Sequence, residues 1–466
     1  MPFANNSLTF RCPSNCKVAG QVLNPRAVGT EVVSYSSYVI GGPGGETVPG
    51  TTGNYRADSF ICPAAIHAGL VSERYGGCGI MTRTGSSNDY PSSHNAGIRS
   101  IGFDATFPSS YGFTTTFTST SCRDLRYHLF AVSIPFTIAL SILCTHPATT
   151  YYTLFTTLFF HVALASDPPY ITNPDGLVSR ALSRYLPAIF IAHTLWTFVF
   201  ARIHNSPLLL TTAHVERTIL FLGGLWVGAL NNFTFDVIIP ISRLTGIDLE
   251  TQPGAKAALA VVCIVLFFIV VGQVHFFRIS GRLPGMLGLY AGVGVGLGLL
   301  AAIPGNSLRI HHYILALLLL PGTKLLTRPS LLYQGLLLGL FINGIARWGF
   351  AGIVETPIAI IGDGVSYTDL PTFIPPDVAR DNVTVHWETE KDSEWEGVSV
   401  LVNDVERVRW SAKGETEGSA VIDRIDGEKT YLRLGYYKFT GEAGDYTRAG
   451  VVWVNGTWEE PEEGWT

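Results

Sequence analysis

Long apolar stretches separated by short polar segments run from residue 126 to residue 353. A helix that crosses a membrane needs about 20 mainly apolar residues. Eight stretches approach or reach this length, and they cover residues 127–145, 149–166, 185–203, 217–236, 256–277, 285–304, 310–327 and 330–350. The pattern predicts an all-α membrane bundle of about eight helices over residues 126–353. The second and seventh stretches are the shortest or most interrupted.

The pattern changes after residue 353. A proline-containing segment, residues 354–376, predicts a linker. Beyond it, runs such as Val383–Trp387 and Val398–Val402 alternate apolar and polar residues, with Gly and Asp between the runs. This period of two is typical of short strands that bury one face. We expect a C-terminal all-β sandwich over residues 377–458, followed by a solvated acidic tail over residues 459–466.

The stretch from Asp58 to Val71 predicts a short buried helix. Asp58 or Ser59 can accept hydrogen bonds from the free amides at its start, and Gly69 suits the left-handed residue that ends a helix. Pro63 requires the helix to begin close to it. The residues between are small or apolar, so other segments can pack closely against this helix.

The motifs around this helix follow a specific order. They are Phe10–Cys16 and Asn54–Asp58 before it, and Gly76–Gly79, Asn88–Ser93 and Asn95–Ser100 after it. In this order they resemble the LCCL domain, the module shared by cochlin and Limulus factor C, over roughly residues 8–118. The likeness is greatest to the multi-pass LCCL proteins of fungi. The C-terminal order of Trp and Tyr positions loosely resembles a fibronectin type III domain.

The LCCL resemblance implies a small α+β fold, in which a central helix is wrapped by two β-sheets and pinned by disulfides. It implies a bridge from Cys16 to Cys62. Family members usually pair the residue equivalent to Cys12 with a cysteine further upstream, and this chain has none, so we expect Cys78 as the substitute partner. Cys122 is then left over. LCCL modules are associated with lipid, polysaccharide or matrix protein ligands, so the resemblance also implies a binding role.

Composition agrees with a membrane block between two soluble ends. The chain is 47% hydrophobic and only 14% charged, whereas about a quarter of the residues of a soluble protein are charged. The net charge of −5 gives no basic footprint for nucleic acid. Cysteines clustered near the N-terminus indicate an oxidising compartment. A domain with disulfides has to be translocated, but the first six residues do not resemble a signal peptide. Either the first membrane segment carries the N-terminus across or the sequence lacks its true beginning, and we expect the second.

Asn-x-Ser/Thr sequons indicate the orientation in the membrane. They occur at Asn5, Asn232, Asn382 and Asn455. Asn232 is too near the predicted membrane for a glycan, so we expect glycosylation at the other three. Both termini are then extracytoplasmic, which requires an even number of spans, and the loop charges agree weakly. The sequence predicts an integral membrane protein of the secretory pathway or cell surface, in contact with membrane lipids.

Glycines at four-residue spacing recur in the predicted spans. They are Gly288, Gly292 and Gly296 in one span, with the pairs Gly224/Gly228 and Gly335/Gly339 in two others. This spacing gives a membrane helix a flat face that allows close backbone packing. We expect these faces to hold a compact bundle together, and a glycine-lined permeation path is the alternative.

Polar residues inside the membrane block form a candidate polar site. They are His161, Asp167, Asp236, His311 and His312. Such residues are costly in a bilayer and need a reason. A metal site is the sharper hypothesis, but no HExxH or similar ligand spacing is present. We therefore expect interhelical hydrogen bonds, with no metal and no cofactor.

The sequence contains no convincing catalytic constellation. Ser59, His67 and Asp58 crowd one end of the predicted LCCL helix without a nucleophile elbow or paired carboxylates. We interpret His67 as a hydrogen-bonded core residue. The preferred function is a non-enzymatic membrane receptor or scaffold that presents the LCCL domain to a lipid, polysaccharide or protein ligand. A small-solute transporter and an intramembrane metal-dependent enzyme are the alternatives.

Overall fold

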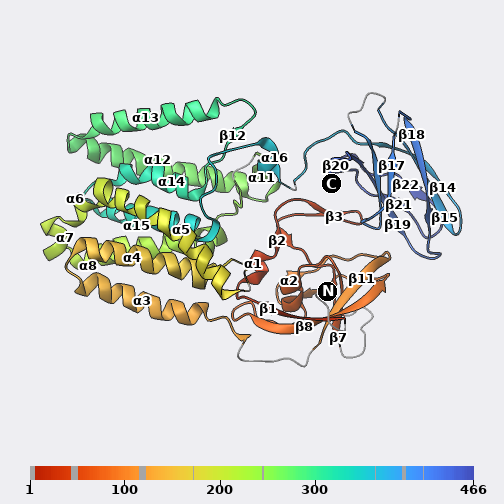
Figure 1. Ribbon diagram of the computed structural model, residues 1–466, viewed down its shortest axis with the longest axis horizontal. Helices are drawn as coiled ribbons and strands as arrows, with labels where there is room; N and C mark the ends of the chain where they lie inside the picture. The colour runs from red at the N-terminus through yellow and green to blue at the C-terminus, as the bar shows by residue number, and fades with distance from the viewer. Residues whose placement is uncertain are drawn as a thin grey trace. The chain divides into compact units, whose positions relative to one another are not determined.

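The structure is a computed structural model that describes residues 6–43, 51–114, 122–169, 171, 173–243, 246–362, 364–390, 395–412 and 414–466. The chain forms two compact units (Figure 1). The first combines Met1–Asp124 with Ile361–Thr466, and the second is Leu125–Ile360. The helical block is therefore inserted between two chain segments that fold together.

The N-terminal part of the first unit packs helix α2 (Ile61–His67) against a five-stranded sheet. The strand order is β1 (Ser7–Cys12), β8 (Gly77–Ser87), β11 (Phe107–Thr114), β7 (Thr51–Arg56) and β6 (Gly41–Gly42). Small two-stranded sheets and one short helix complete it: β2 (Gln21–Val22) with β5 (Ser36–Ser37), β3 (Arg26–Val28) with β4 (Glu31–Val33), β9 (His94–Asn95) with β10 (Ile98–Arg99), and α1 (Cys16–Ala19). The expected β-rich domain with a buried helix is confirmed.

The ends of α2 differ in part from the expectation. Phe60 precedes the helix, and no side chain caps the first turn. The Ser59 hydroxyl instead accepts a hydrogen bond from the Ile40 amide at 2.9 Å, so it joins the helix start to a neighbouring segment. Gly69 has a φ of +75°, as predicted for the residue that ends this helix.

The C-terminal part of the first unit contains two antiparallel sheets. One has the order β14 (Thr372–Val378), β15 (Asn382–Glu388) and β18 (Glu417–Asp423). The other has the order β17 (Val405–Ser411), β16 (Gly397–Val402), β19 (Thr430–Tyr437), β21 (Gly450–Val452) and β22 (Trp458–Glu459), and β20 (Ala443–Tyr446) also pairs with β19. Both sheets contribute to one buried cluster that includes Trp387, Val400 and Leu432. The predicted C-terminal β-structure is confirmed, and its likeness to a fibronectin type III domain stays a prediction.

The expected linker and tail are more structured than predicted. Residues 354–376 contain β13 (Val354–Glu355), α16 (Pro357–Ile361) and the start of β14. The tail does not simply extend into solvent, because the Trp465 indole donates to the Thr368 carbonyl at 2.7 Å and the Thr466 amide donates to the Tyr446 carbonyl. An aromatic residue near the chain end supplies the packing that the acidic residues before it lack.

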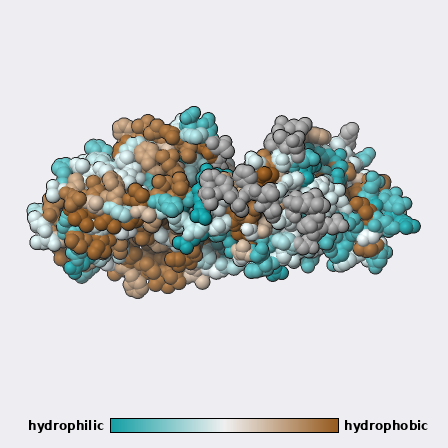
Figure 2. All heavy atoms as spheres, turned by 90° about the horizontal axis from the view of Figure 1, so that it is seen from below, coloured by the Kyte–Doolittle hydropathy of each residue, from teal (hydrophilic) through white to brown (hydrophobic). Residues whose placement is uncertain are grey.

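The second unit is helical. Five of its described helices are long and apolar enough to cross a membrane: Arg126–Leu143 (α3), Pro174–His204, Ala255–Ile279 (α12), Leu283–Ala301 (α13) and Arg328–Trp348 (α15). A sixth span arises if the pair His214–Ala229 and Asn231–Ile238, bent by 83°, crosses as one. Several apolar helices are thus confirmed, and the predicted count of eight is not. The visible face of this unit is largely hydrophobic in Figure 2.

The remaining elements of the second unit are shorter. The predicted second and seventh spans correspond to α4 (Pro147–His161) with η2 (Val162–Ser166), and to α14 (His312–Leu319) with η6 (Leu320–Thr323). The helix Pro174–His204 consists of α5 (Pro174–Leu195), η3 (Trp196–Phe200) and α6 (Ala201–His204). In the bent pair, the first helix consists of α8 (His214–Arg217), η4 (Thr218–Leu222) and α9 (Gly223–Ala229). The second consists of η5 (Asn231–Phe233) and α10 (Phe235–Ile238). The connections hold α7 (Pro207–Thr211), α11 (Gly246–Thr251) and β12 (Ser307–Leu308).

Glycines allow the central helix pair to pack backbone against backbone. A Cβ atom at Gly228 of α9 would lie 2.1 Å from the Leu336 carbonyl oxygen of α15, and one at Gly339 of α15 would lie 2.3 Å from the Leu225 carbonyl oxygen. The predicted role of these two pairs is confirmed. By contrast, Cβ atoms at Gly288, Gly292 and Gly296 of α13 would have no described atom within 4 Å apart from neighbouring backbone of the same helix. The same spacing therefore packs one helix pair within the chain and leaves a second helix without such a partner there.

Candidate functional site

Two disulfides close the N-terminal domain, and their pairing differs from the expectation. Cys12 pairs with Cys62, and Cys78 pairs with Cys122. The expected bridges Cys16–Cys62 and Cys12–Cys78 are therefore wrong in this structure. In the β1–β8 ladder Cys12 lies opposite Gly77, one residue out of register with Cys78. Neighbouring strand positions face opposite sides of a sheet, so Cys12 and Cys78 point apart.

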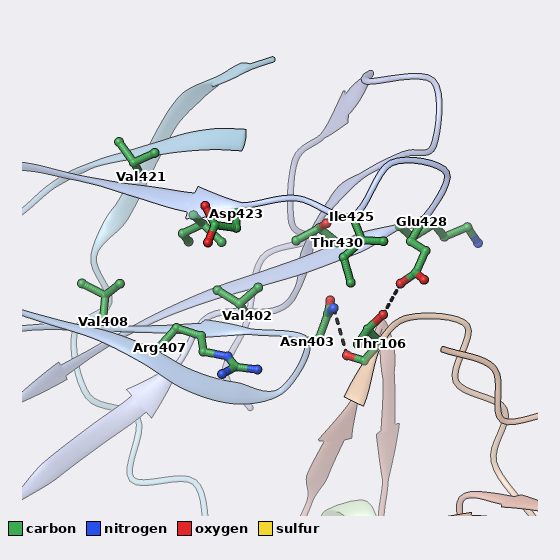
Figure 3. A pocket seen from close by; sticks show the side chains of 12 residues that line it. Thr106, Val402, Asn403, Arg407, Val408, Val421, Asp423, Ile425, Glu428 and Thr430 are labelled. Atoms are coloured by element: carbon green, nitrogen blue, oxygen red, sulfur yellow. Dashed lines mark hydrogen bonds between the residues drawn. The ribbon is translucent and has the colours of Figure 1, made fainter. Parts of the chain in front are cut away.

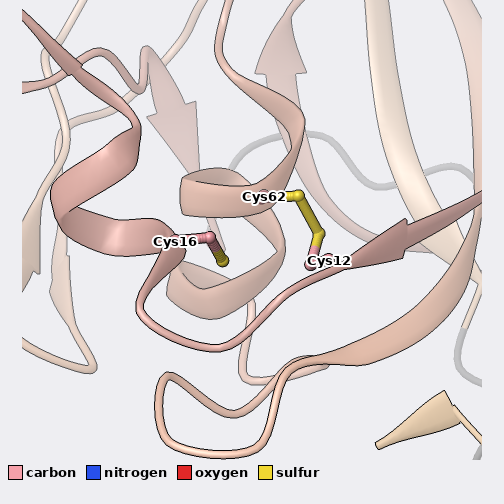
Figure 4. Close-up of side chains that lie close together, drawn as sticks. All are labelled: Cys12, Cys16 and Cys62. Carbon is pink, nitrogen blue, oxygen red and sulfur yellow. A yellow bond between two sulfur atoms is a disulfide. The ribbon is translucent and has the colours of Figure 1, made fainter. Parts of the chain in front are cut away.

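Cys16 lies beside the Cys12–Cys62 disulfide (Figure 4). The three sulfur atoms lie within 4.8 Å of one another, which is close enough for three thiolates to share a metal ion. Two of the three are oxidised to a disulfide here, so the cluster does not offer three thiolate ligands. The disulfide joins β1 to α2, and the two disulfides together suggest extracytoplasmic exposure.

His67 is a core residue, as the sequence indicated. Its imidazole is fully buried, with Nδ1 3.0 Å from the Tyr55 hydroxyl and Nε2 3.3 Å from the Ser93 carbonyl oxygen. Burial lowers the pKa of His67, although the Ser93 carbonyl works in the opposite direction. Both ring nitrogens face protein atoms, so the geometry leaves no open position for a substrate or a metal ion.

A buried ion network joins the N-terminal domain to the C-terminal sheets. Arg56 Nη1 lies 2.8 Å from Asp404 Oδ2, and Arg433 Nε lies 3.3 Å from Asp404 Oδ1. The side chains of Arg56, Arg433 and Asp404 are only 1%, 2% and 9% exposed. Asp404 also accepts a hydrogen bond from the Gly29 amide at 3.0 Å. A buried carboxylate that is matched by two guanidinium groups and an amide is well compensated for its loss of water.

The network is held in place on both sides. On the N-terminal side, Arg56 makes two hydrogen bonds to Asp58, and its guanidinium lies 4.5 and 4.6 Å from the ring centroids of Phe103 and Phe107. On the C-terminal side, Asn403 and Asp404 form the turn between β16 and β17, with φ values of +49° and +61°. Sequence reasoning used Arg56 only as part of an LCCL-like motif and missed this role. The Asn403–Asp404 pair lies between two alternating runs and is a turn signal, so the sequence could have predicted the turn that holds Asp404.

Apolar and charged contacts extend the junction, by which we mean the contact between the N-terminal domain and the C-terminal sheets around the ion network. Tyr431 and Val451 of the C-terminal sheets belong to the same buried cluster as Val28, Ile40 and Phe103 of the N-terminal domain. Lys429 Nζ lies 2.6 Å from Asp104 Oδ2, and the Tyr431 hydroxyl donates to the same carboxylate. Partial burial would raise the pKa of Asp104, but these two partners outweigh it and lower the pKa. The two domains therefore share a core and do not merely touch.

A pocket of ≈ 400 Å³ opens beside this junction (Figure 3). It lies between β17 and β18, each of which is an edge strand of one of the two C-terminal sheets among the described residues. Val402, Val408 and Ile422 line its inner part, and Thr106 contributes from the N-terminal domain. Arg407 and Asp423 flank it from opposite strands. The pocket could not be predicted from the sequence, because neither strand is recognisable as an edge strand before the sheet order is known.

The structure groups some of the predicted polar residues of the helical unit around the bend after α9. Asn232 donates to Asp167 at 2.7 Å, and Arg347 Nη1 lies 3.4 Å from the same carboxylate. Asn231 donates to Asp236 at 2.7 Å. Asp236 interacts electrostatically with His312, Arg347 and Asp167. These contacts join η2, the bent pair and the end of α15.

The other two predicted residues have different partners. His161 Nδ1 lies 3.1 Å from the Ser133 hydroxyl and packs against Trp226, and His311 Nε2 lies 3.6 Å from Glu355 Oε1. Among the described residues of the helical unit, no three His, Cys or acidic side chains converge on one metal position. The interhelical hydrogen bonds that the sequence predicted are present at Asp167 and His161.

Comparisons with known families, curated proteins and solved structures each found a match. Residues 1–110 match the LCCL domain family. An uncharacterized protein of Saccharomyces cerevisiae, YIL067C, is 32% identical over an alignment of 505 residues, which covers 99% of this chain and 73% of the yeast protein. A solved structure, the spore cortex lytic enzyme SleM of Clostridium perfringens, matches at 19% identity over 22% of this chain and 34% of that chain, with a TM-score of 0.16, a similarity too low to support any argument. The chain therefore contains an LCCL domain and belongs to the same family as yeast YIL067C.

Proposed function

We propose that this protein is a non-enzymatic membrane receptor or scaffold that presents one composite binding unit on the extracytoplasmic side. The unit consists of the LCCL domain and the C-terminal sheets together. The observation that supports this most strongly is the buried Arg56–Asp404–Arg433 network, because it ties residues before the helical block to residues after it. Each domain covers part of the other's core, so ligand recognition belongs to the pair.

This arrangement has a consequence for membrane topology. If the segments on both sides of the helical block form one folded unit, the chain enters and leaves the membrane on the same side. The number of crossings is then even, which six spans satisfy and five do not. The two disulfides favour the oxidising side. Both termini are extracytoplasmic in this proposal, in the secretory pathway or at the cell surface.

Glycan attachment tests the topology. Asn382 and Asn455 are exposed sequon residues of the C-terminal sheets, and the Thr457 amide donates to Asn455 Oδ1 at 3.0 Å in an exposed turn. Asn5 lies outside the described residues. We expect an endoglycosidase to increase the gel mobility of the full-length protein, and Asn382→Gln and Asn455→Gln each to remove one step. A protein that is glycosylated at neither position after passage through the secretory pathway contradicts the proposed side.

A ligand panel tests the binding role. The full-length protein in lipid nanodiscs is offered a glycan array, vesicles containing phosphatidylserine and a phage-displayed library of random dodecapeptides. We expect saturable binding to at least one probe, with empty nanodiscs as the control. Binding to none of the three contradicts a receptor role for this unit.

Small-solute transport is a second candidate, which the polar contacts around the bent helix pair favour. Asp167, Asn232 and Arg347 are in contact where the helix is interrupted. Interrupted helices with polar partners are common at the substrate sites of transporters. Transport predicts that Asp236→Ala abolishes solute uptake into proteoliposomes while the protein still folds. Uptake that is unchanged in this variant contradicts it.

A further inference from the structure

We propose that the pocket between β17 and β18 binds an extended peptide segment of a partner protein, which adds as a strand to one of the two edges. This inference rests on the proposed binding function and names its ligand class. Three features of the pocket carry it: two free strand edges, an apolar floor, and flanking charges of opposite sign.

The strand edges supply the main-chain recognition. Within the described residues, β17 pairs only with β16, and β18 pairs only with β15. The outer side of each strand therefore presents unpaired amide and carbonyl groups, which another extended chain can satisfy. Because the pocket is lined by both strands, a peptide lying in it is within reach of these groups.

The floor and rim supply the side-chain recognition. Val402 and Ile422 are buried beneath the opening, whereas Val421 and Ile425 at its rim are 65% and 50% exposed. Branched apolar residues around a ≈ 400 Å³ cavity suit one aliphatic side chain of a peptide and its neighbours. Exposed apolar residues beside a cavity are more informative than isolated ones on a surface.

The flanking charges determine which charged residues of the peptide are favoured at each end of the pocket. Arg407 and Asp423 are exposed, and neither side chain has an ion pair or hydrogen bond within the described chain. On the same strand Glu406 and Arg409 pair with each other, as expected for charges that only protect a free edge. In Figure 3 the Arg407 side chain extends from β17 in the direction of Asn403 and Thr106. A peptide with an acidic residue toward Arg407 and a basic residue toward Asp423 complements this arrangement.

The other ligand classes fit this pocket less well. Sugars stack their apolar faces on aromatic rings, and none of the 12 lining residues is aromatic. An acyl chain needs a continuous apolar channel, whereas here charged and polar side chains alternate with Val and Ile around the opening. The strand edges favour a peptide over both, since only a peptide can continue their hydrogen-bond ladder.

The experiment selects random dodecapeptides displayed on phage against the full-length protein in nanodiscs. Peptides that bind the wild type are then measured against Arg407→Glu, Asp423→Lys and the double variant. We expect each single variant to weaken binding at least tenfold, and the double variant to select peptides with the two charges exchanged. The control is Arg380→Glu/Asp381→Lys, which makes the same charge changes at residues that do not line the pocket.

Three outcomes separate the peptide inference from the proposed function. Selection of no peptide, or peptides that bind all variants equally, overturns the inference. If glycans or vesicles bind at the same time, the receptor proposal stands without it. Peptides that respond to the charge variants support the inference even if Asn382 and Asn455 carry no glycan, and in that case only the proposed membrane side fails.

Discussion

At the scale of single residues, the first unit depends on a few buried polar groups that are fully compensated. Asp404 is surrounded by Arg56, Arg433 and the Gly29 amide, and His67 uses both ring nitrogens. In each case, removing one partner leaves a polar group that cannot reach water. Such losses cost far more than the net value of the interaction itself.

We predict that Asp404→Ala lowers the free energy of unfolding of the first unit by about 3–5 kcal/mol, because it leaves two buried guanidinium groups without their shared carboxylate. Urea unfolding of the purified protein, followed by tryptophan fluorescence, measures this. Asp426→Ala is the matched control. Its partner Arg380 is 81% exposed, so a change of only about 0–1 kcal/mol is expected. Equal effects of the two variants would show that the network does not hold the domains together.

We predict that burial of the His67 imidazole makes the stability of the first unit depend on pH. Burial lowers its pKa from the ordinary value of 6.5, so the unfolded chain takes up a proton before the folded chain does. Stability is therefore complete above pH 6.5 and declines as the pH falls through 6.5 toward the lower folded pKa. We expect His67→Gln to flatten this part of the stability curve between about pH 7 and pH 5. A slope that is identical in the wild type and the variant would assign the effect to other groups.

At the scale of elements, glycines at the same four-residue spacing allow close packing between α9 and α15 but have no packing partner at α13 among the described residues. In α9 and α15 the glycines face each other's backbone, and an added Cβ atom would overlap it. In α13 an added Cβ atom would meet no described atom apart from neighbouring backbone of the same helix. Spacing alone therefore predicts a flat helix face but not which helix covers it, since that depends on the tertiary arrangement.

This difference gives a direct comparison of two substitutions. Gly339→Leu forces a side chain into the α15–α9 contact. It is expected to lower the free energy of unfolding by about 1–3 kcal/mol or more. Gly292→Leu on α13 is expected to change stability by no more than about 0.5 kcal/mol. Thermal unfolding in the same detergent compares them. A larger loss for Gly292→Leu would mean that α13 is packed as closely as α15.

At the scale of the whole molecule, the sequence identified the three regions and the LCCL domain, because each depends on local pattern or local motif. The helix at Ile61–His67 follows from the residues that bound it, the C-terminal strands from a period of two, and the long helices from the length of their apolar runs. The disulfide partners did not follow, since they depend on the β1–β8 register. Nor did the junction, because Arg56 and Asp404 are 348 residues apart in the sequence and no local rule connects them.

The same limit applies to the pocket and to the membrane residues. The role that we propose for Arg407 and Asp423 can be recognised only when β17 and β18 are known to be edge strands. Asp167 and Asp236 were recognisable as costly residues in a membrane, but their contacts with Asn232 and Asn231 depend on a bend of 83° that apolar periodicity does not reveal. Long-range pairing is the information that a single sequence lacks.

Zero-length cross-linking of the intact protein tests most directly whether the two ends of the chain form one unit. Lys429 Nζ and Asp104 Oδ2 are 2.6 Å apart, so a carbodiimide should join them by an amide bond. Mass spectrometry of the digested protein is expected to find the Asp104–Lys429 cross-link in the wild type and to lose it in Lys429→Arg, which keeps the charge. The Lys438–Glu442 pair within the C-terminal sheets, 3.2 Å apart, serves as the positive control. Detection of the control cross-link without the Asp104–Lys429 cross-link would contradict a composite unit.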